Sequence, residues 1–311
     1  MATFSRKLWE ARMVANFSEI SVLPLMTTAP TEMTAESVTF NRAKPATVSE
    51  YNGTVNWEDA QTSNVTMTFD HKYYFAVKVD DIDKAQTNIP VLDATVASTT
   101  AEMSTDCDVY AYDKYIKGAG TRIVNKVITT DNGVYDAIVD LGVELGKKKV
   151  PVSNRYVIIG WDSLGKLQKD SRFTHNPDVL ANGIVNGQKI NGMNIVVTAS
   201  IPANTILAIY KGSVGYGQQI NELEGMRLQS SFSDGVRGLN VAGALVLNAD
   251  GVAALDYTSD TSATTAKYRI VDTPATNPYT AGYYELGTDG TFSATADTTV
   301  TEGKTYYTTN F

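Results

Sequence analysis

The clearest pattern in the chain is an alternation of apolar and polar residues between Val65 and Val79. Apart from His71, the odd-numbered positions are apolar or aromatic, and most even-numbered positions are polar. A period of two residues predicts a single strand with one buried face. Such a strand would span roughly 50 Å, whereas a usual strand has about five or six residues. The pattern therefore predicts an unusually long element.

A long helix is predicted after the acidic segment that contains Asp80, Asp81 and Asp83. From Pro90 to Lys117 the apolar positions recur with a helical spacing, and this helix would be roughly 42 Å long. Those positions are Leu92, Val96, Met103, Cys107 and Tyr110. Two elements of this length suit an elongated subunit that contacts its neighbours better than a compact, single-core enzyme.

The first residues, 1–34, are predicted to form an arm that begins with a short amphipathic helix. Its apolar and aromatic positions include Phe4, Leu8, Trp9 and Phe17. A helix this short has no core of its own and must dock on another surface. That surface belongs either to its own domain or to a neighbouring subunit, and the sequence leaves both open.

Residues 35–79 read as an extended loop that returns through the long strand. Asn52-Gly53 is a strong signal for a tight turn, and Trp57 follows it closely. An excursion of this length without a core is usually functional or bound to a partner. We therefore predict assembly contacts in the arm and the loop, at Phe4, Leu8, Trp9, Phe17, Trp57 and Phe69.

A second lobe, residues 121–222, mixes strands and helices, which indicates an α+β fold. A strand is predicted at 122–129, then a helix capped by Asp131 that carries Val134, Ile138, Leu141 and Leu145. The cations Lys147–Lys149 end that helix and suit its dipole better than they suit a nucleic acid site. A buried strand at 155–161, a short helix at 162–167 and further strands follow. Strands at 224–231 and 236–247 are expected to rejoin the first lobe, in a segment 223–257.

Residues 258–311 differ in composition from the rest of the chain. They contain 16 Thr and 6 Tyr and show no helical periodicity. Short strands separated by turn residues predict a small all-β module appended after residue 257.

Composition and charge narrow the classes of function. The net charge of −8 argues against nucleic acid binding as a property of the whole surface, because phosphate contacts require clustered Lys and Arg. The single cysteine, Cys107, is predicted to be a buried structural thiol. Charged residues interrupt the N-terminal apolar stretch, and no run is long enough for a membrane span. We therefore expect a soluble, non-exported chain without membrane contact.

No arrangement of catalytic residues is recognisable. The two histidines, His71 and His175, lack a spacing typical of a zinc site. The segment Gly212–Gly217 lacks the Lys-Ser/Thr of a phosphate-binding loop. The acidic residues 80–83 lack the Gly and Glu that would complete a calcium loop, and they read as a solvated joint. The sequence predicts no catalytic, cofactor-binding or metal site, and no enzyme.

Three segments resemble the major capsid proteins of tailed bacteriophages. The first is the run His71–Gln86 with the long helix after it, the second is Gly192–Pro202, and the third begins with Gly225-Met226-Arg227-Leu228. The resemblance covers roughly residues 1–257. It implies a Hong Kong 97-type fold with an N-terminal arm (1–34), an extended loop (35–79), a peripheral domain with a spine helix (80–120) and an axial domain (121–222). Residues 223–257 would return to the peripheral domain.

The resemblance also implies a function. The chain would assemble as pentamers and hexamers into an icosahedral shell that encloses double-stranded DNA without sequence-specific binding. Partners would be scaffolding, portal or other virion proteins, and the location would be the virion, after the host cytoplasm. An encapsulin-type nanocompartment shell and a surface ligand-binding protein remain as alternatives.

Overall fold

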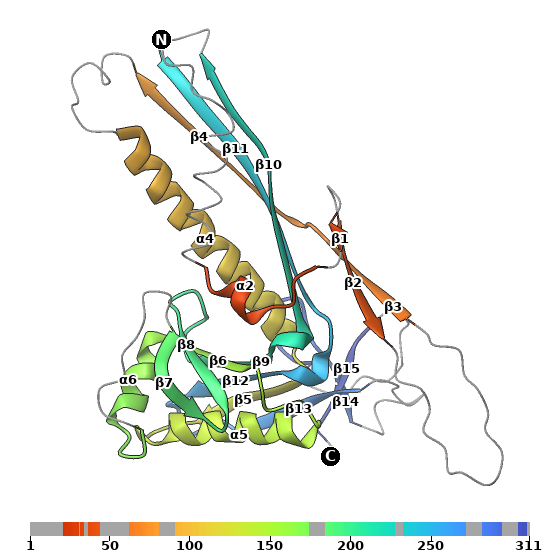
Figure 1. Ribbon diagram of the computed structural model, residues 1–311. Helices are drawn as coiled ribbons and strands as arrows, with labels where there is room; N and C mark the ends of the chain where they lie inside the picture. Colours follow the sequence, from red (N-terminus) through yellow and green to blue (C-terminus); the bar gives the residue numbers. More distant parts are fainter. Residues whose placement is uncertain are drawn as a thin grey trace, which may run out of the picture.

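The computed structural model shows an elongated subunit in which a long helix and three long strands rise from a broad sheet (Figure 1). It describes residues 21–30, 32–33, 37–43, 62–80, 91–173, 184–227, 233–271, 282–293 and 304–309. The helices in this part of the chain are α2 (Leu23–Met26), α4 (Val91–Lys117), α5 (Gly133–Lys147) and α6 (Trp161–Lys169). Two short 3-10 turns are η1 (Lys211–Ser213) and η2 (Ala249–Gly251). The predicted long helix is confirmed.

Helix α4 packs along a three-stranded sheet with the order β10-β11-β4. Its strands are β10 (Val214–Arg227), β11 (Ser233–Val246) and β4 (His71–Asp80). Buried α4 side chains, among them Cys107, Tyr112 and Tyr115, lie in one apolar cluster with Ala242 and Ala244 of β11. This contact accounts for the helical spacing of apolar residues. It also confirms Cys107 as a buried thiol, and burial raises its pKa to about 11.

The predicted single strand from Val65 to Val79 is in fact two strands in different sheets. Strand β3 (Thr62–Thr68) belongs to a sheet with β1 (Glu32–Met33) and β2 (Ser37–Ala43), whereas β4 pairs with β11. The alternation nevertheless continues across the break, since Met67, Phe69 and Phe75 are all buried. An alternation reports which face is buried and not which strand is the neighbour, so it did not reveal the break.

The break between β3 and β4 is held against α4 by side chains on either side of it. Asp70 accepts hydrogen bonds from Tyr110 and from Lys114, the latter at 2.9 Å. Burial acts to raise the pKa of Asp70, but these bonds outweigh it and lower the pKa. His71 lies 2.8 Å from Asp106 and stacks on Tyr110, which supports the structural role predicted for this histidine.

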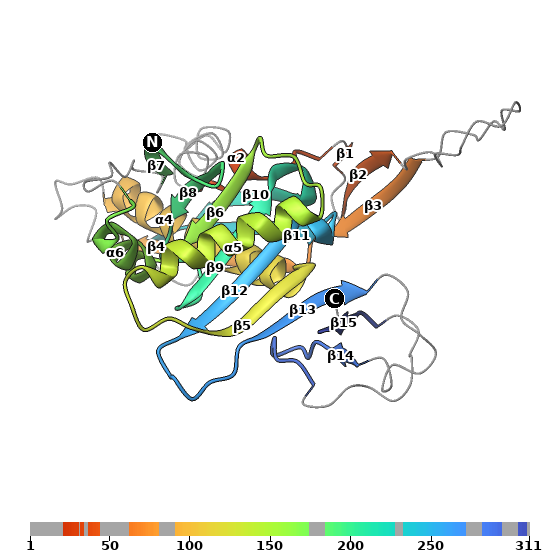
Figure 2. The same ribbon diagram turned by 90° about the horizontal axis from the view of Figure 1, so that it is seen from below.

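A mixed nine-stranded sheet forms the base, in the order β14-β15-β13-β5-β12-β9-β6-β8-β7. Its strands are β5 (Thr121–Val127), β6 (Arg155–Ile159), β7 (Ile184–Ile190), β8 (Met193–Val197), β9 (Thr205–Tyr210), β12 (Val252–Thr258), β13 (Ala266–Val271), β14 (Tyr283–Glu285) and β15 (Tyr306–Thr308). Helix α5 lies across one face, as Figure 2 shows, and the end of α4 with α2 covers the other. Both faces are therefore buried, which explains the continuous apolar run of β6.

The strands after residue 258 do not form a separate module, contrary to the prediction. Strand β13 pairs antiparallel with β5, and β14 and β15 follow it at the edge of the same sheet (Figure 2). Strand β12 also lies in this sheet, between β5 and β9, rather than with β10 and β11. Composition could not show this, because the open edge of β5 is created by the tertiary fold. The boundaries of the domains otherwise remain predictions.

Around α5 and α6, the structure corrects two local predictions, the cap of α5 and the end of β6, and supports a third, the structural role of the lysines after α5. Helix α5 begins after Asn132, and no side chain makes a capping hydrogen bond there, so Asp131 is not its cap. Strand β6 ends at Ile159, and Trp161 opens α6 with 55% of its surface exposed. Lys147 and Lys148 form ion pairs with Glu144 and Asp250, which supports their structural interpretation.

Candidate assembly surfaces

Most of the predicted assembly contacts lie outside the described residues. These are Phe4, Leu8, Trp9, Phe17 and Trp57, and they remain predictions. Phe69 is described and is only 4% exposed, because it packs with Val38, Phe40, Met67 and Val241. The structure thus places the Phe69 side chain inside its own subunit, where it holds β3 against β11 and offers a neighbour no contact surface.

Two large exposed side chains mark surfaces that sequence reasoning did not select. Tyr74 of β4 is 79% exposed, and Trp161 at the start of α6 is 55% exposed. Aromatic residues of this size supply much of the binding energy when a partner buries them. In the sequence, Tyr74 lies on the polar side of the alternation and Trp161 lies at the end of an apolar run. Neither position indicates a contact residue, so only the exposure of the two side chains in the folded subunit identifies them.

The face of the β10-β11-β4 sheet that is turned away from α4 carries residues of both charges around Tyr74. Lys72, Lys78 and Arg237 are exposed on this face, since the register places them on the same side as Tyr74 and Leu239. The chain as a whole is acidic, with a net charge of −8. The register also places Glu222 of β10 opposite Leu239 and Glu224 opposite Arg237, so this face is of mixed charge. The even-numbered lysines of the alternation could have pointed to this face, but no contact was predicted from them.

On the opposite side, α2 lies across α4 (Figure 1), and a carboxyl group of α4 is buried near this contact. Asp108 of α4 is 8% exposed, and the hydroxyl of Ser21 donates a hydrogen bond to it at 2.7 Å. Burial raises the pKa of Asp108 to about 6, and the bond from Ser21 offsets only part of this effect. The contact between the end of the arm and the spine helix therefore contains a group that titrates near neutral pH.

An ion cluster ties the C-terminal strands to α5. Glu144, with 6% of its side chain exposed, contacts Lys267 and Arg269 of β13 as well as Lys147. Burial acts to raise the pKa of Glu144, but hydrogen bonds from these three cations outweigh it and lower the pKa to about 2. The carboxylate therefore stays ionised at any physiological pH.

Arg122 and an aromatic cluster make a second connection to the C-terminal strands. The Arg122 guanidinium bonds to Asp256 at 2.8 Å and to the carbonyl oxygen of Gly290 at 2.9 Å. It also lies over the ring of Phe292, which stacks on Tyr268 at 3.7 Å between centroids. Together with the ion cluster, these contacts make the C-terminal strands part of the base.

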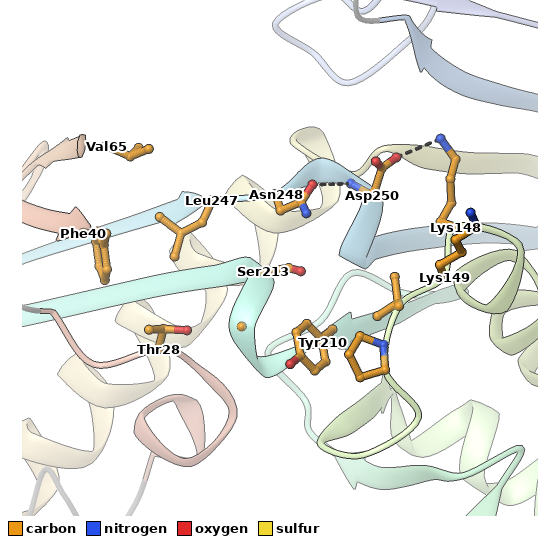
Figure 3. A pocket seen from close by; sticks show the side chains of 13 residues that line it. Thr28, Phe40, Val65, Lys148, Lys149, Tyr210, Ser213, Leu247, Asn248 and Asp250 are labelled. Carbon is orange, nitrogen blue, oxygen red and sulfur yellow. Dashed lines mark hydrogen bonds and ion pairs between the residues drawn. The ribbon is translucent and has the colours of Figure 1, made fainter. Parts of the chain in front are cut away.

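A cavity of about 280 Å³ lies where the extended-loop strands, the arm and the base meet (Figure 3). It is lined by Thr28, Phe40, Val65, Lys148, Lys149, Val150, Pro151, Tyr210, Gly212, Ser213, Leu247, Asn248 and Asp250. Two contacts fix its walls. Thr28 donates to the carbonyl oxygen of Lys211 at 2.8 Å, and Lys148 pairs with Asp250 at 2.7 Å. The cavity combines apolar walls with a cationic rim.

Nothing in the described residues resembles a catalytic centre. No group of three His, Cys, Asp or Glu side chains in this part of the chain is placed to hold a metal ion. No helix that the structure describes is long and apolar enough to span a membrane. The distinctive features are the surfaces and contacts above, not a reactive site.

The fold has counterparts among solved structures. The capsid structure of the cyanophage P-SCSP1u matches with a TM-score of 0.61 and 17% identity over 76% of this chain and 87% of that chain. This chain has the Hong Kong 97-type capsid fold. A structure from Mycobacterium phage Che8 matches with a TM-score of 0.58 and 20% identity, covering 77% of this chain and 90% of that chain.

A virus-like particle from Pyrococcus furiosus shares the fold as well, with a TM-score of 0.55 and 14% identity over 79% of this chain and 96% of that chain. No protein-family model matches the sequence, and no curated protein does. At 14–20% identity, these matches show a shared fold.

Proposed function

We propose that this chain is the major capsid protein of a tailed bacteriophage. It assembles as pentamers and hexamers into an icosahedral shell that encloses double-stranded DNA without reading its sequence. The observation that supports this best is the match to nearly the whole length of a phage capsid subunit. The subunit's shape agrees with the role, because long elements expose much surface for neighbours and little for a buried site.

The proposal assigns the contacts to several parts of the chain. The arm (1–34) and the loop around Trp57 reach neighbouring subunits, and the exposed Tyr74 and Trp161 are buried on assembly. Scaffolding, portal or other virion proteins are the further partners, and no membrane is involved. The protein acts in the virion after assembly in the host cytoplasm. It is a structural protein and not an enzyme.

Particle formation by the purified full-length chain tests this function. We expect closed shells in negative-stain electron microscopy and a fast-sedimenting species in analytical ultracentrifugation, alone or with the neighbouring virion proteins. A chain that stays monomeric under all these conditions, with no particles in infected cells, contradicts the proposal.

A nanocompartment that holds an enzyme cargo is the second candidate, because the Pyrococcus furiosus particle shares the fold. The contents of purified particles separate the two functions. Double-stranded DNA supports the virion, whereas one specific enzyme without DNA supports the nanocompartment. A surface ligand-binding protein is the weakest alternative, since the C-terminal strands on which it rested extend the base sheet.

Replacing Trp161 with Ala is expected to weaken assembly while the subunit keeps its stability. The side chain is 55% exposed, so its removal should change the free energy of unfolding by about 0.5 kcal/mol or less. If a neighbour buries it, the concentration needed for half-maximal assembly rises about tenfold or more. Light scattering against protein concentration measures this, and Trp161→Phe is the matched control. Unchanged assembly of Trp161→Ala would remove this residue from the interface.

A further inference from the structure

Lys149 occupies a backbone conformation that favours glycine. Its φ angle is +58°, directly after the C-terminus of α5. The amide of Lys149 donates to the carbonyl oxygen of Gly146, and the amide of Val150 to that of Leu145. This pair of bonds is the Schellman arrangement, in which the residue at the left-handed position is usually glycine. Lysine there destabilises the subunit, because its Cβ crowds the backbone.

The side chain of Lys149 differs from those of the two lysines before it. Lys147 pairs with Glu144 and Lys148 with Asp250, so both have carboxylates of their own subunit. Within the described residues no ion pair or hydrogen bond is found for the Lys149 ammonium group. The side chain is exposed at the rim of the cavity, next to Lys148 (Figure 3).

The cavity beside Lys149 has the chemistry of a socket for a protein segment. Phe40, Val65, Leu247 and Tyr210 supply apolar and aromatic lining, while the exposed Lys149 and the Lys148–Asp250 ion pair lie at its rim. About 280 Å³ holds one or two side chains rather than a large ligand. An occupant that pairs an apolar side chain with a carboxylate would complement both the walls and the rim.

A second copy of this chain is the occupant that the charges favour. Each copy carries 34 acidic and 26 basic residues, so acidic side chains outnumber basic ones on every subunit. Two such subunits repel each other unless cations lie at their contact. A lysine that has no carboxylate of its own among the described residues is suited to that task.

We infer that Lys149 and the cavity beside it bind a carboxylate-bearing segment of a second copy of this chain. This contact rests on the proposed shell-forming function and names one residue that serves it. It explains why lysine stands where glycine would fold better. The strained backbone at Lys149 lowers the stability of the free subunit, whereas the ion pair with a neighbour forms only on assembly.

Replacing Lys149 with Gly separates the two effects. The substitution relieves the backbone and removes the charge, so the melting temperature of the unassembled subunit should rise by about 2–4 °C. The concentration for half-maximal assembly should rise about two- to fivefold, because a charge pair is lost at each contact. Assembly of the wild type should also weaken more steeply with salt than assembly of the variant.

Two further variants separate the effect of the charge from the effect of the backbone conformation. Lys149→Asn tolerates the left-handed backbone without a cation and should assemble as poorly as Lys149→Gly. Asn154→Gly is the matched control: Asn154 has a φ of +57°, and this change relieves the backbone without altering charge. It should leave the assembly concentration and its salt dependence as in the wild type.

The outcomes distinguish this inference from the function beneath it. If the wild type assembles and both Lys149 variants assemble at the same concentration, the inference is overturned while the shell function stands. If Asn154→Gly weakens assembly as much as Lys149→Gly, loop geometry and not the charge is responsible, and the inference is also overturned. If the wild type forms no particles, the proposed function itself fails.

Discussion

Removing residues 259–311 is expected to unfold the subunit rather than to trim an accessory. The deletion takes away β13, whose hydrogen bonds cover the edge of β5. It also removes Tyr306 and Tyr307, which are 1% and 2% exposed. Burying side chains of this size contributes several kcal/mol, and an uncovered strand edge promotes aggregation. A separate module would have been dispensable, so this result distinguishes the two architectures.

The deletion also removes two of the three cations that contact Glu144. Without Lys267 and Arg269, this carboxylate remains in the base with Lys147 as its remaining cationic contact. Together with the lost burial of the two tyrosines, this removes a large part of the roughly 5–15 kcal/mol that stabilises a domain. Truncated protein is therefore expected in the insoluble fraction.

Point substitutions test the same cluster without a truncation. Changing both Lys267 and Arg269 to Met should lower the free energy of unfolding by about 3 kcal/mol or more. Adding Glu144→Gln should recover much of the loss, because it removes the stranded charge. Urea unfolding of the three proteins measures the difference. Two outcomes would contradict the integration of the C-terminal strands into the base. One is a soluble, cooperatively folded 1–258 fragment, and the other is an unchanged free energy of unfolding when Lys267 and Arg269 are both changed to Met.

The second large effect is a pH-dependent stability that depends on Asp108. Its pKa is raised to about 6 in the folded subunit from an ordinary value of 3.8, because α2 and α4 bury it. Between these values the folded state binds the proton more tightly than the unfolded chain does. Stability from this group therefore falls as the pH rises from about 4 to about 6, and the full cost persists at neutral pH. The shift corresponds to about 3 kcal/mol.

The substitution Asp108→Asn is expected to remove that cost. It keeps an oxygen that can accept the Ser21 hydroxyl bond but carries no charge at neutral pH. The variant should be about 2–3 kcal/mol more stable than the wild type at pH 7.5, and the difference should shrink toward pH 4. Among the described residues, the titratable groups near Asp108 are Cys107, Tyr112, Tyr115 and Tyr216, and none of them is a cation.

Urea unfolding at several pH values measures the difference between wild type and variant. Asp113→Asn is the matched control on the same helix, because Asp113 is about half exposed and pairs with Lys117. It should change stability by about 0.5 kcal/mol or less at any pH. A stability difference for Asp108→Asn that is independent of pH would show that the carboxyl group does not titrate in this range.

Local pattern accounted for much of the architecture. Helix α4 ends at Lys117 as its spacing indicated, and Val134, Ile138, Leu141 and Leu145 of α5 are buried. These successes share a cause, because each element buries one face and the period of the apolar residues reports that face. Cys107, buried on the inner side of α4, follows from the same rule.

The assembly surfaces were harder to find. Tyr74 and Trp161 became candidates only when their exposure was known, since an aromatic residue in a sequence is as often core as surface. Phe69 shows the converse, because its position in the alternation was correct while its neighbours, such as Val241 of β11, lie far away in the sequence. Contact residues of this kind depend on which strands meet.

The sequence by itself determined the class of fold, the long helix, the buried thiol and the alternation that orients β3 and β4. Only the tertiary structure decided that β3 and β4 belong to different sheets and that β13 continues the base. It also decided that Lys149, unlike Lys147 and Lys148, has no carboxylate partner within the part of the chain that the structure describes. The physical reason is the range of the interactions. The period of the apolar residues shows which face of a helix or strand is buried, and this is a local property. Strand pairing and ion pairs join residues that are distant in the chain, so a local pattern does not report them.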